Sequence, residues 1–161
     1  MIISLQYLAG FVDGEGWIGV YRAIPNGLQQ KSARYTLEVG IGQTLKGQEL
    51  FDYLEETYGG YVSFYQPKTK NAKAQCKYVV TGDNALRLLE KIEPYLILKK
   101  EQANICIRFQ REKSGLNKKF NNFRGKLVPP HITKKRESYY QALKLLNFKG
   151  NEITSHNSTR R

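Results

Sequence analysis

The first apolar run of the chain has the spacing of a helix with one buried face. Leu8 is followed by Phe11 and Val12, and intervals of three and four residues place side chains on the same side of a helix. Ser4 precedes the run and can accept a hydrogen bond from a free amide as an N-cap. The pattern predicts a helix over about residues 4–13.

Two later pairs of segments alternate between apolar and polar residues, as half-buried strands do. Residues 17–23 and 32–43 flank a Pro-Asn-Gly turn, and both contain many aromatic and β-branched side chains. Residues 61–66 and 75–81 flank a turn rich in lysine. Each pair predicts a β-hairpin.

Helical spacing returns between and after the two hairpins. Residues 47–58 form an amphipathic pattern that ends at two glycines. Asp83 is expected to cap a third helix that ends at Pro94, and a fourth helix is expected to begin near Leu98. The predicted order is therefore α-β-β-α-β-β-α-α, an α+β fold with helices against an antiparallel sheet.

The composition changes at Arg111. Residues 111–132 contain few aliphatic side chains and many charged ones, and we interpret them as a long loop or basic arm. A last helix is expected over about residues 134–146, followed by a flexible tail. This interpretation predicts a core domain over residues 1–110 and an arm, helix and tail over residues 111–161.

The charge of the chain narrows the class of partner. The sequence has 26 Lys and Arg residues against 14 Asp and Glu residues, which gives a formal net charge of +12. Such a balance favours a polyanionic partner, and nucleic acid before others. A basic protein without a nucleic-acid site would have the same composition, so the charge alone leaves both alternatives open.

The cysteines and the N-terminal segment indicate a reducing compartment inside the cell. Cys76 and Cys106 lie in an expected strand and an expected helix, where they resemble small apolar residues rather than a disulfide or zinc framework. The opening segment lacks a basic start and reaches acidic residues too early for a signal peptide or a membrane span. We therefore expect an intracellular protein in a reducing compartment, with no membrane partner.

The segment LAGFVDGEG at residues 8–16 places two acids at the end of the first helix. Asp13 and Glu15 meet the negative end of the helix dipole there, which is unfavourable by up to about 1 kcal/mol each. The carboxylate of Glu15 and the backbone carbonyl of Gly14 are oxygen donors of the kind that Mg²⁺ prefers. A magnesium site would offset the unfavourable charge. The alternative is that Glu15 is a solvated turn residue.

Gly10 and Gly14 lie four residues apart and share a face of this helix. Small residues at that spacing let two helix backbones approach closely. If two copies of the helix cross there, two carboxylates meet around metal ions, as two-metal phosphodiester hydrolysis requires. The alternative is that the glycines only let the helix pack on its own core.

These residues resemble the signature of the LAGLIDADG homing endonuclease family. The match of LAGFVDGEG is supported by the element order and by PYLILKKEQA at residues 94–103, which resembles a second, weaker family stretch. The resemblance covers about residues 1–110. It implies an αββαββα core with a curved antiparallel DNA-binding sheet, plus C-terminal helices.

The activity that this resemblance implies is site-specific cleavage of double-stranded DNA. A member of the family makes metal-dependent double-strand breaks in a long DNA target, with Mg²⁺ as cofactor. Mn²⁺ is expected to replace Mg²⁺, and Ca²⁺ is expected to bind without supporting cleavage.

The resemblance also assigns catalytic roles. Glu15 would hold the metal together with the carbonyl of Gly14, Gln43 would organise solvent around the scissile phosphate, and Lys99 would polarise the phosphate or its water. A shift of one residue in the register would give this last role to Lys100. Without the family, Gln43 and Lys99 would be an ordinary strand-end amide and a solvated lysine.

One position departs from the family pattern. Where some members carry an arginine a few residues after the glutamine, this chain has Gly47 with Lys46 beside it. Whether Lys46 takes over the role of the arginine stays open at the level of the sequence.

A single motif without an internal repeat implies a homodimer, because family members with one motif pair two copies of it. The expected interface residues lie on the motif helix: Leu8, Gly10, Phe11, Asp13 and Gly14. Two-fold symmetry implies a pseudo-palindromic target. A strand of six or seven residues spans roughly 20 Å, near six base pairs, so two protomers should contact on the order of 20 base pairs.

Strand alternation and the lysine-rich segments suggest the DNA contacts. In the second expected strand a polar set opposes an apolar set, so the polar side chains would face the major groove. Lysines of the second hairpin turn and of the basic arm would contact phosphates. A solvated sheet face and a solvated loop are the alternatives. The candidate DNA-binding residues are Tyr21, Arg22, Arg34, Thr36, Glu38, Ser63, Tyr65, Lys68, Lys70, Lys73, Gln75, Lys77, Lys118, Lys119, Arg124 and Lys126.

Other functions are compatible with the same family resemblance. The chain could be an RNA maturase that assists intron splicing, or a DNA-binding relative that does not cut, and the retention of Glu15 favours the nuclease over both. From a different class, a basic ribonucleoprotein component would share the charge without any catalytic site.

Overall fold

The computed structural model of the protein describes residues 3–25, 32–68, 73–119, 123 and 127–149. Its elements follow the predicted order, and two short 3₁₀ turns, η1 (Leu45–Gly47) and η2 (Glu93–Tyr95), join them. The helices and strands are α1 (Leu5–Glu15), β1 (Gly16–Ala23), β2 (Arg34–Thr44), α2 (Gln48–Tyr58), β3 (Tyr61–Tyr65), β4 (Gln75–Thr81), α3 (Gly82–Ile92), α4 (Lys100–Lys119) and α5 (Pro130–Lys149).

The four strands form one antiparallel sheet in the order β1-β2-β4-β3. Because residues alternate between the two faces of a strand, the register sorts the side chains into a core face and an open face. On the core face Val39 stands between Ile18 of β1 and Val80 of β4, and all three are buried. The central strands β2 and β4 therefore supply much of the apolar core.

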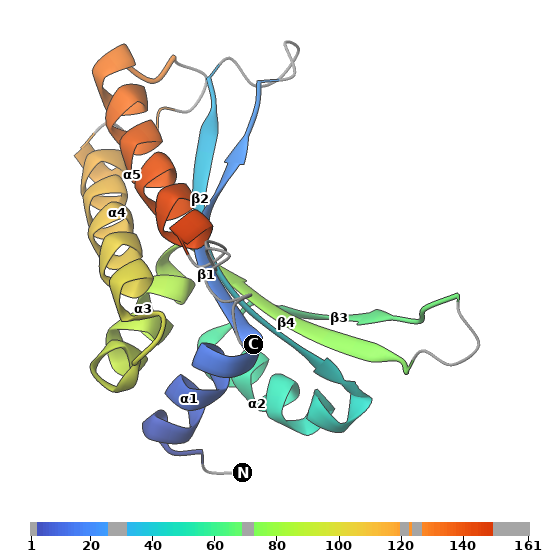
Figure 1. Cartoon of the computed structure of the whole chain (residues 1–161). Coiled ribbons are helices and arrows are strands. Elements are labelled where there is room, and N and C mark those ends of the chain that lie inside the picture. Colours follow the sequence, from blue (N-terminus) through green and yellow to red (C-terminus); the bar gives the residue numbers. More distant parts are fainter. Residues whose placement is uncertain (1–2, 26–31, 69–72, 120–122, 124–126, 150–161) are drawn as a thin grey trace, which may run out of the picture.

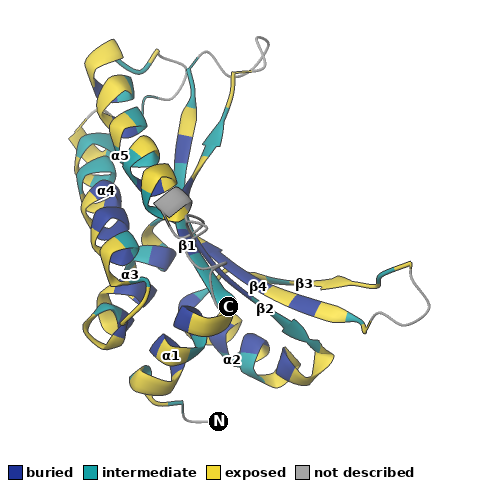
Figure 2. Ribbon diagram, in the orientation of Figure 1, coloured by how far each residue is buried: buried dark blue, intermediate teal, exposed yellow. Residues whose placement is uncertain are grey.

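The sheet bends so that its two hairpins form the arms of a concave surface (Figure 1). The helices lie on the convex side, where α1, α3, α4 and α5 all contact β1 or β2 and α2 contacts β4. Buried residues gather between these helices and the sheet, whereas most residues of β3 are exposed (Figure 2). One face of the sheet is thus covered, and the concave face stays open.

The first helix is longer than its apolar pattern predicted. It continues through Glu15, because the N–H of Gly16 still donates to the carbonyl of Val12 and closes a further turn. Glycine at position 14 does not end the helix, so the motif acids lie within its last turn. The predicted cap of α3 is also wrong: Thr81 occupies the N-cap, and Asp83 lies in the first turn.

The prediction of a long loop over residues 111–132 is wrong for its first part. Residues 111–119 continue α4, and α5 begins at Pro130, four residues before the expected start. Partners from other helices stabilise these charged turns: Arg111 pairs with Glu90 of α3 at 2.8 Å. The expected boundary at residue 110 therefore falls inside a continuous helix.

The last helix joins the core of the protein. Helix α5 contacts α4, β1 and β2, and its Leu143 is buried in the same apolar cluster as the sheet residues. The ring of Tyr139 meets Phe109 of α4 edge-on, with 5.7 Å between the ring centroids. The helix thus stabilises the convex side of the β1–β2 arm.

Some predicted residues lie outside the described part of the chain. These are Lys70, Arg124, Lys126 and the tail over residues 150–161. Within the described residues, no helix has the length and apolar character that a membrane span requires.

Candidate active site and nucleic-acid interface

The C-terminal end of α1 exposes the two predicted metal donors. Gly14 and Glu15 are both exposed in the last turn of the helix. The final carbonyls of a helix lack donors within the helix, and here the ammonium of Lys99 donates to the carbonyl of Asp13. A cation supplied by the chain itself therefore stands at the negative end of the helix dipole, in the turn of α1 that ends at Glu15.

Asp13 fixes the position of that lysine. Its carboxylate accepts hydrogen bonds from the backbone N–H groups of Ile97, Leu98 and Lys99, at 2.7, 3.2 and 2.9 Å. These amides immediately precede α4, which begins at Lys100. The carboxylate thus joins the end of α1 to the start of α4, where the helix dipole favours a negative charge.

Gln43 lies near the C-terminal end of β2, at the end of the sheet where α1 leads into β1. Gly16, the first residue of β1, pairs with Ile41, so Gln43 extends β2 past the point where α1 enters the sheet. Its alternation with Ile41 places its side chain on the core face, the side on which α1 packs. Its Oε1 accepts from the N–H of Thr44 at 2.8 Å, which leaves the amide N–H₂ group as a donor.

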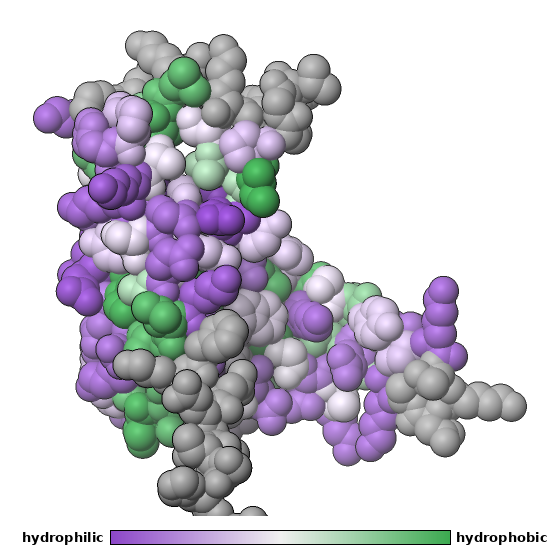
Figure 3. All heavy atoms as spheres, turned by 45° about the horizontal axis from the view of Figure 1, so that its top comes forward, coloured by the Kyte–Doolittle hydropathy of each residue, from purple (hydrophilic) through white to green (hydrophobic). Residues whose placement is uncertain are grey.

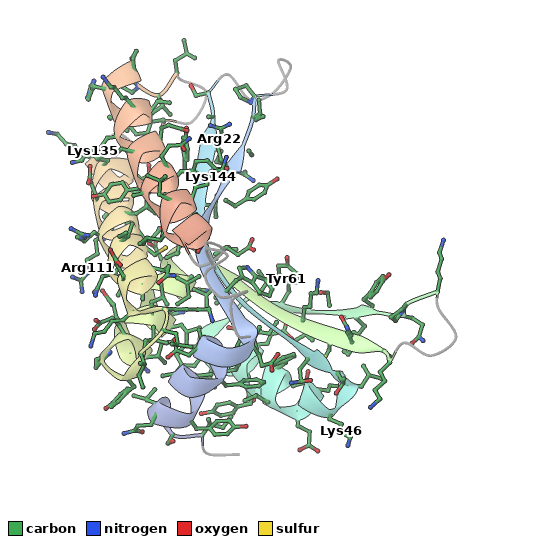
Figure 4. The ribbon with its side chains drawn as sticks, viewed as in Figure 1. Arg22, Lys46, Tyr61, Arg111, Lys135 and Lys144 are labelled. Carbon is green, nitrogen blue, oxygen red and sulfur yellow. The ribbon has the colours of Figure 1, made fainter. Side chains whose placement is uncertain are left out.

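The residue that replaces the family arginine stands close to this glutamine. A Cβ atom added at Gly47 would lie 3.0 Å from the Cβ of Gln43. The side chain of Lys46 is exposed at the 3₁₀ turn before α2 (Figure 4). Gly47 therefore accommodates the side chain of Gln43.

The donors at the end of α1 fit a hard divalent cation. A carboxylate and a backbone carbonyl are the oxygen ligands that Mg²⁺ takes from proteins, and water and phosphate oxygens complete its octahedral shell. Within the described part of one chain, no cluster of three or more His, Cys, Asp or Glu side chains occurs. Glu15 and Gly14 would contribute two oxygens from each protomer.

The expected dimer face divides into outer and inner residues. Gly10 and Gly14 are exposed, and an added Cβ at either would meet no atom within 4 Å. Phe11 is half-buried, whereas Leu8 and Asp13 are only 2% and 8% exposed. Leu8 packs in the core of the protomer and Asp13 faces the loop before α4, so the exposed part of the expected dimer face consists of Gly10, Gly14 and part of Phe11.

The open face of the sheet carries half of the predicted nucleic-acid contacts. The register places Tyr21 beside Thr36, and Lys77 between Gly42 and Ser63. Lys68 and Lys73 flank the turn of the β3–β4 hairpin and are exposed. Hydrophilic residues cover most of the described surface in the view of Figure 3. The predicted residues on this face are Tyr21, Arg34, Thr36, Glu38, Ser63, Tyr65, Gln75 and Lys77.

Arg22 does not lie on the open face. Its guanidinium pairs with Glu137 of α5 at 2.8 Å and stands over the ring of Tyr140, 5.1 Å from the centroid (Figure 4). Tyr35, opposite Arg22 in the register, donates from its hydroxyl to the same glutamate, and this hydrogen bond lowers the pKa of Glu137. The prediction of DNA contact by Arg22 is therefore wrong, because strand alternation turns it toward α5.

Several cationic side chains of the predicted arm lie among the helices and form ion pairs with them. Arg111 and Lys135 lie on the outer side of the helical layer, away from the concave sheet (Figure 4), and Lys135 pairs with Glu112 at 2.7 Å. Arg136 is only 9% exposed, and burial lowers its pKa. Lys118 and Lys119 occupy the last turn of α4 and are exposed.

Strand alternation also identifies residues that the prediction omitted. Tyr61 pairs with Val79 and shares the open face with Ser63 and Tyr65 (Figure 4). It is 54% exposed. Extending the alternation of the third strand by two residues toward its start, from Ser63 to Tyr61, would have included it.

The comparison with known protein families identifies the family of this chain. The family model described as LAGLIDADG endonuclease matches residues 8–106, more than half of the chain. The chain belongs to the LAGLIDADG endonuclease family. No curated protein sequence matches it.

Solved structures of LAGLIDADG enzymes share the fold. I-CvuI in complex with the I-CreI target and Mg, with the DNA not cleaved, is 21% identical over 97% of this chain and 85% of its own, with a TM-score of 0.65. The complex of I-CvuI with its own target and Ca is 20% identical over 98% of this chain and 85% of its own, with a TM-score of 0.66. I-SmaMI bound to cleaved DNA is 19% identical over 94% of this chain and 46% of its own, with a TM-score of 0.64. The LAGLIDADG fold predicted from the motif and the element order is confirmed.

Proposed function

We propose that this LAGLIDADG protein is a Mg²⁺-dependent, site-specific DNA endonuclease that acts as a homodimer. Its substrate is a long pseudo-palindromic duplex, in which it makes a double-strand break. The arrangement of Lys99, Asp13 and Glu15 at the end of α1 carries the proposal, because it gathers an oxygen-donor pair and a cation at one exposed point.

The chemistry follows from these groups. Mg²⁺, when held by Glu15 and Gly14, would act as a Lewis acid on a phosphate oxygen. Lys99 stabilises the negative charge that develops on the phosphate during cleavage. The free amide N–H₂ group of Gln43 donates to the water or phosphate oxygens at the same edge of the sheet.

Two copies of the protomer supply two such sites. The exposed glycines of α1 allow a second α1 to approach, since no atom of the described residues occupies the space that their side chains would fill. A helix pair crossing there brings two Glu15 carboxylates together, one for each DNA strand. Sedimentation should therefore give about twice the chain mass of 18.5 kDa.

The concave sheet supplies the surface for the duplex. Its open face carries Arg34 and Lys77 among tyrosines and small polar residues, and the chain has a formal net charge of +12. Phosphate contacts position a duplex, and side chains in the major groove read its bases. The DNA complexes of I-CvuI and I-SmaMI, which share the fold, support this use of the surface.

The test compares Glu15→Gln with wild type on a duplex selected from a randomised library. Glu15→Gln should bind the selected duplex in Ca²⁺ with wild-type affinity, while its cleavage in Mg²⁺ falls by about a hundredfold or more. Glu56→Gln, an exposed residue of α2, is the matched control and should cut like wild type. Undiminished cutting by Glu15→Gln, or cutting in the presence of a chelator, would refute the proposed mechanism.

A further inference from the structure

Glu38 is the one acidic residue on the open face of the four described strands. The other side chains of that face are neutral, or cationic as in Arg34 and Lys77. A carboxylate on a surface that receives DNA is repelled by phosphates. If it contacts the duplex, it must do so through a hydrogen-bond donor on a base.

Trp17 holds the carboxylate in place. Its indole N–H donates to Oε1 of Glu38 at 2.9 Å, and its ring lies over Gly40, the residue that pairs with it across the strands. A Cβ atom added at Gly40 would lie only 2.0 Å from a ring carbon, so glycine is required there. The ring, the glycine and the carboxylate therefore form one ordered unit in the middle of the sheet.

The second oxygen of this carboxylate is open to a ligand. Glu38 stands between Gly19 of β1 and Thr81 of β4. Gly19 has no side chain, and no atom lies within 4 Å of where its Cβ would be. Among the described residues, the indole N–H of Trp17 donates to Oε1 of Glu38, which leaves Oε2 of this open-face side chain as an acceptor.

We propose that Glu38, oriented by Trp17, selects a base with an exocyclic amine, cytosine or adenine, at one position of each half-site. The inference rests on the proposed function, which places a duplex against this face. In the major groove only the N4 amine of cytosine and the N6 amine of adenine donate hydrogen bonds. Guanine and thymine present acceptors there, and the carboxylate repels them.

The conservative variant Glu38→Gln turns the preference away from cytosine. Its amide oxygen still accepts from the indole of Trp17, so the ordered unit persists, and its N–H₂ group then faces the duplex. A donor at this point favours guanine or thymine over cytosine. One contact of this kind changes base preference by about tenfold.

The experiment sequences the duplexes that the full-length protein binds in Ca²⁺ and cuts in Mg²⁺ from a randomised library. Wild type should enrich cytosine or adenine at one position per half-site, Glu38→Gln should select against cytosine there and enrich bases that present an acceptor, and Trp17→Phe should lose the discrimination at the same position. Glu56→Gln on α2 is the control for preference. Thermal unfolding of each variant confirms its fold.

Two outcomes would overturn the proposal, and they are distinguishable. If wild type selects and cuts a site but Glu38→Gln keeps the same base preference at every position, this inference alone fails. If wild type neither binds nor cuts any duplex, the proposed function fails and the inference fails with it.

Discussion

Asp13 and Lys99 hold each other through two reciprocal contacts. The backbone N–H of Lys99 donates to the carboxylate of Asp13 at 2.9 Å, and the ammonium of Lys99 donates back to the carbonyl of Asp13. This pair joins α1 to the loop before α4 and brings a cation to the last turn of α1, which ends at Glu15. Asp13, the buried acid of the motif, thus positions Lys99, a basic residue of the candidate site.

Replacing Asp13 by Asn should therefore affect both stability and cleavage. The amide keeps one acceptor oxygen and turns a donor toward the amides of Ile97, Leu98 or Lys99, so that some of these part-buried donors lose their partner. We expect the free energy of unfolding in urea to fall by about 2 kcal/mol. Cleavage in Mg²⁺ should fall even at temperatures where the variant is fully folded.

Asp52→Asn, an exposed position of α2, is the matched control for Asp13→Asn. Its unfolding free energy and cleavage should both stay at the wild-type level. If Asp13→Asn behaved in the same way, the carboxylate would not be fixing the position of Lys99.

Lys99 and Lys100 should differ sharply in their contribution to cleavage. Only the side chain of Lys99 reaches the end of α1, whereas Lys100 is exposed and its ammonium lies 4.0 Å from Glu93. Lys99→Met should bind the selected duplex but cut it about a hundredfold more slowly. Lys100→Met should cut at the wild-type rate in the same assay, and the opposite result would mean that the register is shifted by one residue.

Gly10→Ala should leave the protomer intact and weaken the dimer. Alanine in a helix is more favourable than glycine by about 1 kcal/mol, and within the described part of the protomer nothing lies within 4 Å of the added Cβ. A second α1 packed closely on that position would be displaced, which should raise the dimer dissociation constant by about tenfold. Analytical ultracentrifugation over a concentration series measures this change.

Gly115→Ala provides the control for Gly10→Ala, since Gly115 is also an exposed helical glycine with no atom near an added Cβ. It should not change the dimer dissociation constant. An unchanged constant for Gly10→Ala as well would show that α1 does not mediate dimerisation.

Lys113 should impose a pH dependence on stability. Burial lowers its pKa from 10.5 to about 8, and the charge of Arg136 adds to the effect. Between these values the unfolded chain binds more protons than the folded one, so this group adds stability as pH rises from about 8 to 10.5. Below a pH of about 8, Lys113 is charged in the folded protein, and the partial desolvation of that charge lowers the free energy of unfolding by its full amount.

Lys113→Met removes this cost, so it should be more stable than wild type at pH 7. The advantage should shrink as pH rises through the interval between about 8 and 10.5. Urea unfolding of both proteins across this range measures the difference between their free energies of unfolding. The tyrosines and cysteines titrate in both proteins, so their contribution cancels in this difference. A difference that stays constant with pH would contradict the assignment.

The sequence by itself determined the order of the elements, the alternation of β2 and the identity of the motif residues. Each depends on local periodicity: apolar spacing marks a helix, and alternation marks a strand face whose partners need not be known. The position of Glu15 and Gly14 at the exposed end of α1 followed from the same local pattern. The lysine-rich turn and the polar set of β2 were assigned to a surface for the same reason.

Only the tertiary structure decided which partners these residues meet. Asp13 binds amides 84 to 86 residues away, Arg22 pairs with a glutamate 115 residues away, and Glu90 of α3 pairs with Arg111 in the part of α4 that composition assigned to a loop. These contacts pair opposite charges or satisfy buried polar groups, and their free energy depends on which elements pack together. Periodicity along the chain carries no information about such pairs, because it reports the face of a residue and not the element that covers it.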